Sequence, residues 1–461
     1  MTLFAPGDPR PIHFMGIAGA GMSALALIAR RRGVAITGCD TDPLGAADVA
    51  ALGVVIQTGH SPAHLEGVRA VVVTAAVPQD HPELVQARAA GIPVIRRADA
   101  LGEAVAGGTL VAVAGTHGKT TTTAMVTEAL QAAGRNPTGL VGGRVAEWGG
   151  NARLGGTDLY VVEADEYDRA FLSLRPTVAV INNVEADHLE CYGSLEALES
   201  AFAEFASGAR RVIVGADDPG AQRVAGRLAS PVWRVGTGAT ADVRIGDARF
   251  TPEGSTARVT LPDGGTVTLA LRVPGLHNLR NAATALAVLQ ALGIEVEAGR
   301  RALAEFRGVA RRFERLGEAG GVTLVDDYAH HPTEVRATLA AARHAYPGRR
   351  LIAVFQPHLY SRTALHGQAL GEALAAADLA VIAPIYGARE RPVPGVTSDV
   401  VARAAAQAGA TVVAVRDRAA LTDEVRRVVR AGDVVLTLGA GDVTRVGREL
   451  AARPGPAPVA A

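Results

Sequence analysis

Lysine is almost absent from this sequence of 461 residues. The chain has 46 lysine and arginine residues together, and only one of them, Lys119, is a lysine. Lysine carries a compact ammonium charge and arginine a wide planar guanidinium, so the two do not replace each other in a tight pocket. Lys119 stands in the segment GTHGKTT, residues 115–121. We therefore interpret Lys119 as a functional residue. The alternative is that arginine replaced lysine elsewhere in the chain and that this lysine was kept by chance.

Cysteine and long apolar runs are also scarce. The two cysteines, Cys39 and Cys191, show no CxxC spacing, and we expect reduced thiols in a cytoplasmic protein. The net charge is zero and no polybasic run occurs, which argues against nucleic acid or an anionic membrane as a partner. We expect no signal peptide and, without a run of about 18 apolar residues, no membrane span. The tail from residue 453, rich in proline and alanine, is expected to be frayed.

Short apolar strands alternate with helical patterns along the chain, which is typical of α/β proteins with parallel sheets. The length favours about three domains. We place them at residues 1–107, 108–314 and 315–461, with a hinge at 101–108. Alternating polar and apolar residues around LPDGG predict a small antiparallel piece within 243–273. The main predicted strands are 12–17, 34–40, 68–75, 93–96, 109–115, 159–164, 177–182, 211–214, 322–326, 351–356, 379–384 and 433–438.

The segment GTHGKTT follows a predicted strand and opens a predicted helix, which is the context of a phosphate-binding loop. It is not a full Walker A motif, because residue 113 is valine. Glycines let the backbone approach phosphates, and the N–H groups at a helix N-terminus face the anion. The lysine would reach the β- and γ-phosphates, and the Thr120 hydroxyl would bind Mg²⁺. The predicted ATP-binding residues are Gly115, Thr116, His117, Gly118, Lys119, Thr120 and Thr121.

Two acidic segments follow later strands. EADEYD, residues 163–168, begins with Glu163, and carboxylates at strand ends near a phosphate loop commonly hold Mg²⁺. A solvated acidic turn explains the same pattern equally well. In NNVEADH, residues 182–188, His188 becomes a candidate metal ligand beside a nucleotide site, although imidazole is an unusual ligand for Mg²⁺.

Near the N-terminus, GIAGAGMS places Gly16, Gly19 and Gly21 between the first strand and the first helix. The spacing differs from G-x-G-x-x-G, but it allows the same close approach of a pyrophosphate to a helix N-terminus. Asp40 ends the second predicted strand, where an acid that binds a ribose would lie. These residues fit a dinucleotide, another nucleoside diphosphate, or a tight turn without a ligand.

Four more polar clusters follow. Asn278 and Asn281 lie one turn apart at the start of a predicted helix. Their amides could form hydrogen bonds to the edge of a nucleotide base, or one could cap the helix while the other is an ordinary surface amide. Arg311 and Arg312 offer charge for a phosphate, or form a solvated pair. The segments VDDYAHHPTEV, residues 325–335, and FQPHLYSRT, residues 355–363, both end strands of the third block. Together they predict a site at the carboxyl edge of its sheet.

In combination these motifs resemble the Mur ligase family. The resemblance runs through HFMGIAGAGMS, GTHGKTTTTAM, EADEYDRAFLSLRP, NNVEADH, HNLRNA, RRFE, VDDYAHHPTEV, FQPHLYSRT and GAGD. His117 and the HHPTE run indicate the branch that adds alanine. The resemblance implies a Rossmann-like UDP-sugar domain, a central P-loop ATPase and a Rossmann-like C-terminal domain that binds the amino acid and closes over the site. It also implies that ATP and Mg²⁺ drive ligation of L-alanine to UDP-N-acetylmuramate through an acyl phosphate.

The family pattern also implies roles for single residues. Lys119 would contact the phosphates, Thr120 and Glu163 would hold Mg²⁺, and His188 would bind a second Mg²⁺. Further implied roles are adenine contacts for Asn278 and Asn281, a nucleotide contact for Arg312, the ATP ribose for Asp326, and L-alanine for His331 and Arg362. The UDP diphosphate would bind at Gly16, Ala18, Gly19, Ala20, Gly21, Met22 and Ser23, beside Asp40.

One departure and three rival functions stay open. Several Mur-type ligases use a carbamylated lysine, but this chain has no second lysine and carries Ala203 in the expected helix. We predict that no carbamylated lysine exists here.

The rival functions are a ligase that recycles an intact tripeptide, an NAD-dependent dehydrogenase built on residues 16–40, and a nucleotide-gated regulatory protein. The dehydrogenase leaves residues 115–121 and the lone lysine unexplained. The regulatory protein would bind ATP but show no turnover that depends on an amino acid. We expect a monomer or a weak homodimer.

Overall fold

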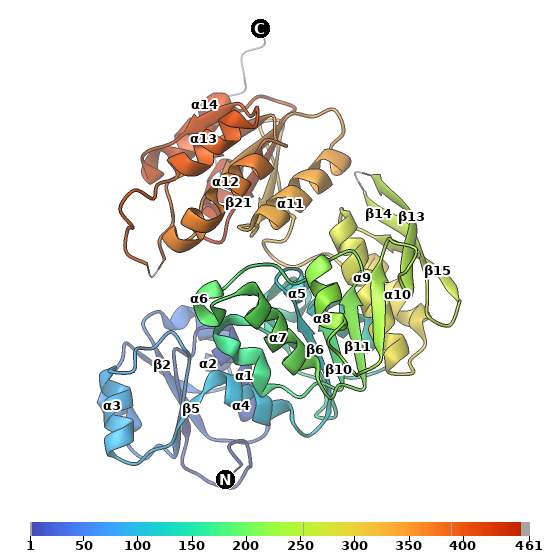
Figure 1. Ribbon diagram of the computed structural model, residues 1–461. Helices are drawn as coiled ribbons and strands as arrows, with labels where there is room; N and C mark the ends of the chain where they lie inside the picture. The colour runs from blue at the N-terminus through green and yellow to red at the C-terminus, as the bar shows by residue number, and fades with distance from the viewer. Residues whose placement is uncertain (1, 252, 389, 453–461) are drawn as a thin grey trace. The chain divides into compact units, whose positions relative to one another are not determined.

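The protein is a mixed α/β molecule with three sheets (Figure 1). A computed structural model describes residues 2–251, 253–388 and 390–452, so the tail from residue 453 lies outside the described residues. The chain divides into two compact units. The first comprises residues 1–246, 258–269 and 280–304, and the second comprises 247–257, 270–279 and 305–461. The N-terminal sheet and most of the central sheet belong to the first unit.

The N-terminal sheet is parallel throughout and has the strand order β3-β2-β1-β4-β5. This is the Rossmann order, in which the chain changes direction between β1 and β4 and ligands bind beyond the carboxyl ends of these strands. Strand β3 was not predicted, because it lies at the sheet edge and is half exposed. The elements are β1 (Ile12–Met15), α1 (Ala20–Arg31), β2 (Ile36–Asp40), η1 (Pro43–Ala46), α2 (Ala47–Ala50), β3 (Val55–Thr58), η2 (Pro62–Leu65), β4 (Ala70–Val73), α3 (Pro82–Ala89), β5 (Val94–Arg96) and α4 (Arg97–Val105).

The predicted hinge at 101–108 is wrong over most of its length. Residues up to Val105 belong to α4, and Ala104 and Val105 are buried. Gly102 serves close packing, since a Cβ there would lie 2.4 Å from the carbonyl oxygen of Ser173 in the central domain. One hydrophobic core runs through both sheets of the first unit, which is why they form a single body.

The central sheet has ten strands in the order β15-β14-β13-β12-β11-β10-β6-β9-β7-β8. Strand β6 is fully paired between β10 and β9, and its residues after Thr109 are buried. The elements are β6 (Thr109–Ala114), α5 (Lys119–Ala132), β7 (Thr138–Val145), η3 (Ala146–Trp148), β8 (Gly150–Arg153), β9 (Leu159–Glu163), η4 (Tyr167–Ser173), β10 (Val178–Ile181), α6 (Leu189–Tyr192), α7 (Leu195–Ala206), β11 (Arg211–Gly215), α8 (Pro219–Ala225), β12 (Val232–Gly236), β13 (Val243–Thr251), β14 (Gly254–Thr260), β15 (Thr266–Leu271), α9 (Leu276–Ala291) and α10 (Val296–Glu305).

The predicted antiparallel piece is the end of this sheet. Strands β14 and β15 are neighbours joined by five residues, and Leu261 N donates to Gly265 O at 2.8 Å across the turn. Such a short connection joins only antiparallel strands. The alternation of polar and apolar residues follows from it, because these strands bury one face.

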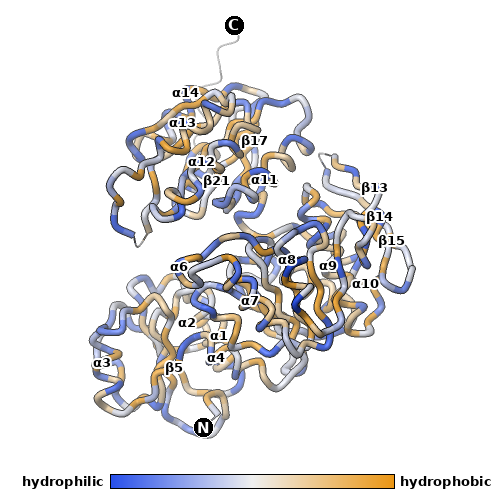
Figure 2. The backbone as a smooth tube through the Cα atoms, viewed as in Figure 1, coloured by the Kyte–Doolittle hydropathy of each residue, from blue (hydrophilic) through white to orange (hydrophobic). Residues whose placement is uncertain are grey.

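The C-terminal sheet has the order β16-β17-β21-β18-β19-β20, and only β16 pairs antiparallel. Helices α11, α12 and α13 cover one face, while α14 and α15 cover the other. Figure 2 shows the alternation of hydrophilic and hydrophobic residues along α13 and α14. The elements are β16 (Glu314–Ala319), β17 (Val322–Asp327), α11 (Pro332–Ala345), β18 (Leu351–Phe355), α12 (Tyr360–Leu374), β19 (Leu379–Ile382), α13 (Asp399–Gln407), β20 (Val412–Ala414), η5 (Arg418–Ala420), α14 (Leu421–Val428), β21 (Val434–Leu438) and α15 (Thr444–Ala452).

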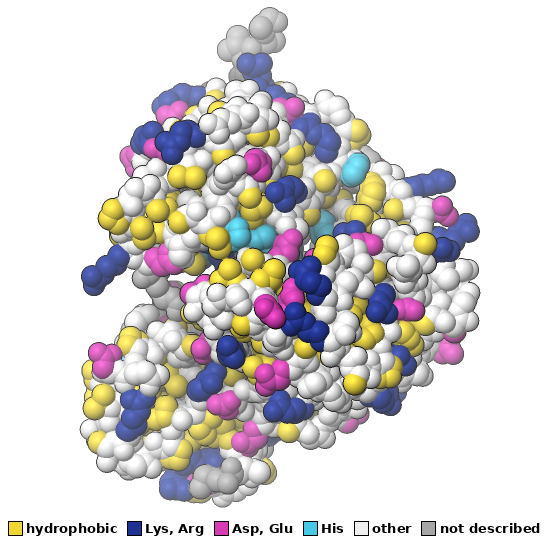
Figure 3. Space-filling view, in the orientation of Figure 1, with side chains coloured by type: hydrophobic (Ala, Val, Ile, Leu, Met, Phe, Trp, Pro, Cys, Tyr) yellow, Lys and Arg dark blue, Asp and Glu magenta, His cyan; other side chains and the backbone are white. Residues whose placement is uncertain are grey.

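No helix in the described ranges is both long and apolar enough to cross a membrane. Acidic and basic side chains are interspersed on the face that Figure 3 displays.

Candidate active site

Residues 115–118 link β6 to α5, and residues 119–121 form the first turn of α5, as the sequence predicts. Gly115 and Gly118 have φ values of +130° and +78°, which side chains rarely adopt. A Cβ at Gly115 would lie 3.0 Å from Asn182 N, and one at Gly118 would lie 3.0 Å from Asn281 Oδ1. Both backbone shape and space therefore require glycine. The loop leaves the N-terminus of α5 available to an anion.

Lys119 occupies a small polar pocket within this loop. Its Nζ lies 2.8 Å from the Gly115 carbonyl oxygen and 2.9 and 2.8 Å from the two carboxylate oxygens of Glu166. Burial alone would lower the pKa of Lys119, but the carboxylates of Glu166, Asp165 and Glu163 together outweigh it, and the pKa lies above its ordinary value. Lys119 is therefore a buried ammonium group. Three donors on one nitrogen fit this pocket, whereas a planar guanidinium does not.

Thr120 and Glu163 come together at the end of β9. The Thr120 hydroxyl donates to Glu163 Oε1 at 3.0 Å, and Gly142 N donates to Glu163 Oε2 at 2.5 Å. A hydroxyl and a carboxylate are the oxygen ligands that Mg²⁺ prefers, so this pair suits that ion. Asp168, from the same acidic segment, lies apart and forms an exposed pair with Arg96 at 3.5 Å.

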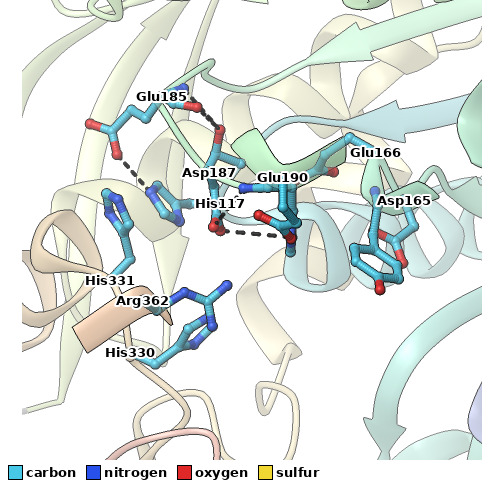
Figure 4. A network of polar contacts seen from close by, with 12 residues as sticks. His117, Asp165, Glu166, Glu185, Asp187, Glu190, His330, His331 and Arg362 are labelled. Atoms are coloured by element: carbon cyan, nitrogen blue, oxygen red, sulfur yellow. Dashed lines mark hydrogen bonds and ion pairs between the residues drawn. The ribbon is translucent and has the colours of Figure 1, made fainter. Parts of the chain in front are cut away.

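Residues 182–185, which follow β10, make hydrogen bonds to the phosphate loop and hold it in place. His117 Nε2 lies 2.7 Å from Glu185 Oε2, as Figure 4 shows, and His117 N donates to Asn183 Oδ1 at 2.7 Å. Asn182 Nδ2 donates to the His117 carbonyl at 3.2 Å and to Thr122 Oγ1 at 3.1 Å. These roles were not predicted, although the NNVE sequence after a strand carries the signal.

His188 sits on the turn that precedes α6 with a φ of 53°. Its Nδ1 lies 3.4 Å from Glu190 Oε1, its Nε2 lies 3.8 Å from Asp187 Oδ2, and its ring meets Tyr167 edge-on at 5.1 Å. The strained turn points to a constrained position for this imidazole. Its role as a metal ligand stays a prediction.

The two asparagines at the start of α9 differ in their surroundings. Asn281 lies against Gly118 of the phosphate loop. Asn278 donates to the Pro274 carbonyl at 2.8 Å, which secures the first turn of its own helix. Both side chains are buried, so neither is a surface amide.

The glycine-rich turn of the N-terminal domain follows β1 at the carboxyl edge of its sheet. Gly16 has a φ of +75°, and its N–H donates to the Cys39 carbonyl at 2.8 Å. Asp40 Oδ2 accepts from Ala18 N at 2.9 Å, so this carboxylate shapes the turn. From the central domain, Asn151 Nδ2 donates to the Ala20 carbonyl and lies 3.4 Å from Ser23 Oγ.

Arg97 lies over this turn and was not predicted. A Cβ added at Gly21 would be 2.8 Å from Arg97 Nη1, so the guanidinium covers the N-terminus of α1. In the described part of the chain Arg97 makes no ion pair. A half-buried cation beside a helix N-terminus is suited to a diphosphate.

In the second unit, two arginines flank Tyr328. The guanidinium carbons of Arg311 and Arg312 lie 4.9 and 5.1 Å from its ring centroid. Arg311 also contacts Asp326 Oδ2 at 3.3 Å, and Arg312 contacts Glu334 at 3.4 Å. These contacts are not those of a freely solvated pair.

Asp326 and Asp327 end β17 in a buried setting. Asp326 accepts from Thr437 Oγ1 at 2.5 Å and from Thr444 Oγ1 at 2.8 Å, and its side chain has no exposed surface. Its contact with the ATP ribose stays a prediction. Burial raises the pKa of Asp327 to about 6, against the opposing charge of Arg312.

His331 and Arg362, the residues implied for L-alanine, lie in separate elements of the second unit. His331 caps α11 in a reciprocal capping box with Glu334, and its ring lies 4.8 Å from that of His366. Arg362 Nη1 lies 3.4 Å from His358 Nδ1. Burial lowers the pKa of His358 to about 4, so this imidazole is neutral near pH 7.

Comparison with known proteins identifies the class. Three family models match consecutive parts of the chain: the Mur ligase family catalytic domain at residues 11–109, the Mur ligase middle domain at 113–289 and the Mur ligase glutamate ligase domain at 311–441. The chain therefore belongs to the Mur ligase family.

Within this family, the chain is similar over nearly its whole length to several individual ligases. The UDP-N-acetylmuramate–L-alanine ligases of Thermobifida fusca and Streptomyces coelicolor are each 44% identical to this chain, over 97% and 96% of it and 98% of their own length. The crystal structure of the UDP-N-acetylmuramate–alanine ligase from Thermotoga maritima matches with a TM-score of 0.81 at 29% identity, covering 96% of this chain and 98% of that one. A murein peptide ligase from Psychrobacter arcticus matches with a TM-score of 0.71 at 26% identity, over 98% and 100%.

Proposed function

We propose that this protein is the ligase that joins L-alanine to UDP-N-acetylmuramate at the expense of ATP. The observation that carries the proposal is the phosphate loop around Lys119 in a chain whose 44% identical relatives, matched over nearly their full length, are UDP-N-acetylmuramate–L-alanine ligases. A dehydrogenase built on the glycine-rich turn would leave this loop without a role. A regulatory protein would not need the amino acid.

The proposed chemistry has two steps. A carboxylate oxygen of UDP-N-acetylmuramate attacks the γ-phosphorus of ATP, and ADP leaves. The L-alanine nitrogen then attacks the carbonyl carbon of the acyl phosphate, and phosphate leaves as the nitrogen loses its proton. The substrates bring the nucleophiles, so the protein positions the groups and balances charge. Lys119 and the N–H groups of residues 115–121 would hold the phosphates.

We propose that Thr120 and Glu163 hold Mg²⁺, because their oxygens already meet at 3.0 Å. His188 would hold a second ion. Bound Mg²⁺ neutralises phosphate charge as it develops. An acyl phosphate hydrolyses readily, so the site must exclude water during the reaction.

The other substrates would bind at the remaining predicted residues. We assign the UDP diphosphate to residues 16–23 with Asp40, and the adenosine of ATP to Asn278, Asn281, Arg312 and Asp326. L-alanine would meet His331 and Arg362. The corresponding domains are residues 1–107, 108–314 and 315–461. We propose a monomer or weak homodimer that works in the cytoplasm, and the unpaired state of both cysteines agrees with a reducing compartment.

ADP release in the presence of Mg²⁺-ATP and UDP-N-acetylmuramate tests the proposal. Separate reactions contain L-alanine, D-glutamate or the tripeptide L-alanyl-γ-D-glutamyl-diaminopimelate. Turnover with L-alanine alone supports the proposed function. Turnover with the tripeptide alone would identify a recycling ligase instead, and the likeness to the murein peptide ligase makes this the second candidate.

A further inference from the structure

The N-terminal domain contains a buried group of metal-ligating side chains that the ligase chemistry does not use. His13 lies on β1 and Cys39 on β2, and both point to the sheet face covered by η2 and α3, where Met15, Leu65 and Leu84 form a small core. His64 belongs to η2, and Glu83 belongs to α3. The glycine-rich turn lies at the end of the same strand β1.

The donor atoms of these four side chains converge. His13 Nε2 lies 3.3 Å from Cys39 Sγ, which lies 3.7 Å from each carboxylate oxygen of Glu83. His64 Nδ1 lies 2.9 Å from Glu83 Oε1, and one donor atom from each residue falls within 4.8 Å of all the others. Ligands at ordinary zinc bond lengths on a tetrahedron lie about 3.3–3.8 Å apart, so small shifts would close the four around one ion.

Burial and charge support a cation at this point. His13, Cys39 and Glu83 have no exposed surface, and the His64 side chain is 12% exposed. The ion pairs that Glu83 makes within the described ranges are with the imidazoles of His60 and His64, not with an arginine. A buried carboxylate needs a positive partner, and a divalent ion supplies one.

The ring nitrogen of His13 that faces away from Cys39 has a hydrogen-bond partner, as the second nitrogen of a metal-bound histidine usually does. His13 Nδ1 lies 3.0 Å from the Thr37 hydroxyl, which leaves Nε2 directed at Cys39. A hydrogen bond at the opposite nitrogen fixes the ring of a metal-bound histidine in this way.

We propose that His13, Cys39, His64 and Glu83 bind one structural transition-metal ion, with Zn²⁺ as the preferred species. A thiolate with two imidazoles and a carboxylate selects Zn²⁺ or Co²⁺ over Mg²⁺, which takes oxygen ligands. Four protein ligands leave no open position for a substrate. The ion would join η2 and α3 to strands β1 and β2. The Cys39 carbonyl at the end of β2 accepts hydrogen bonds from the N–H groups of Gly16 and Ile17, so the site lies next to the glycine-rich turn.

Titration of the chelator-treated full-length protein with Zn²⁺ against a competing chromophoric chelator tests the proposal, without ATP or UDP-sugar present. We expect one tight site, and Cys39→Ser should weaken it by at least about 100-fold, since it removes a ligand. With Co²⁺ we expect a thiolate-to-cobalt charge-transfer band and intense visible bands of four-coordination. Cys191→Ser is the matched control, because it removes the other thiol and leaves the four ligands intact.

His64→Ala is a second variant, because His64 is the least buried ligand and its loss disturbs the core least. It should keep a charge-transfer band while weakening zinc binding, and circular dichroism verifies that each variant is folded. Zinc should raise the melting temperature of the wild type and of Cys191→Ser but not of Cys39→Ser. Equal affinity in the wild type and Cys39→Ser, or cobalt binding without a charge-transfer band, would overturn the proposal.

Discussion

Lys119 and Glu166 form a buried ion pair in which one ammonium nitrogen contacts both carboxylate oxygens, at 2.9 and 2.8 Å. Their side chains are only 14% and 2% exposed. The lysine that would hold the phosphates of ATP is therefore already paired within the protein. Because a phosphate must compete with Glu166 for the same nitrogen, the pair keeps the lysine charged and in place until ATP arrives.

Replacement of Lys119 by arginine should abolish most of the activity. The guanidinium keeps the charge but does not fit among the Gly115 carbonyl, Glu166 and the phosphates. We expect kcat/KM for ATP to fall by at least about 100-fold, comparable to the loss of one preorganised donor at a reacting centre. Steady-state kinetics measure this, with Arg135→Lys, in the turn after α5, as the matched control. Near wild-type kinetics in Lys119→Arg would refute the interpretation that catalysis requires a lysine at this position.

Removal of one partner of the pair should destabilise the first unit. Lys119→Met leaves the Glu166 carboxylate buried without its cation, which costs about 3–5 kcal/mol. The double variant Lys119→Met/Glu166→Gln should recover much of this loss, since neither charge remains. Urea denaturation followed by tryptophan fluorescence is suitable, because Trp148 and Trp233 both lie in the first unit. Additive effects of the two substitutions would contradict a coupled pair.

Arg97 should contribute to binding of the UDP-sugar. Arg97→Ala removes the cation that covers Gly21 at the start of α1. If the diphosphate binds there, KM for UDP-N-acetylmuramate should rise by about 10-fold or more, which corresponds to one charged hydrogen bond. KM for ATP should stay within about twofold. Arg30→Ala, at the opposite end of the same helix, is the control. An equal change in both KM values would argue for a general structural defect.

Activity should not depend on carbon dioxide. A carbamylated lysine requires a lysine besides Lys119, and none exists in the chain. Ala203 lies on α7 and is partly buried, so its methyl group cannot replace a carbamate. Turnover in degassed, bicarbonate-free buffer should match turnover after bicarbonate is added. Stimulation by bicarbonate would contradict this prediction.

The sequence predicted the central strands and the phosphate loop because their signals are local. Strands buried on both faces, such as β6 and β18, have continuous apolar sequences, and the two loop glycines lie within four residues of each other. Edge strands β3 and β20 escaped prediction, since they are short and half exposed. Residues 101–105 of the predicted hinge are the end of α4 instead, and Gly102 there packs against the Ser173 carbonyl, a contact between distant segments that the sequence does not display.

The histidine, cysteine and glutamate group could not be predicted from the sequence. Consecutive members lie 26, 25 and 19 residues apart, and no spacing within a single element brings them together. Strand order does so instead: β1 and β2 are neighbours, and η2 and α3 cover their shared face. For the same reason the contact of Arg97 with Gly21 required the structure, since it joins α4 to α1.

The stability of the second unit should fall as pH rises through the titration of Asp327. Its pKa is about 6 in the folded protein and 3.8 ordinarily, so between these values the folded state holds a proton that the unfolded state has lost. The stabilisation is complete below about pH 4 and is lost above about pH 6, a difference on the order of 3 kcal/mol. Asp327→Asn cannot titrate and should lack this dependence.

Urea denaturation followed by far-ultraviolet circular dichroism between pH 4 and 7 measures this difference. The free energy of unfolding of the wild type relative to Asp327→Asn should decline across the interval and level off above pH 6. Because the comparison is made at each pH, the titration of all other groups cancels. Asp80→Asn, an exposed position, controls for the loss of one carboxylate. A constant difference between wild type and Asp327→Asn would show that this carboxyl group ionises alike in both states.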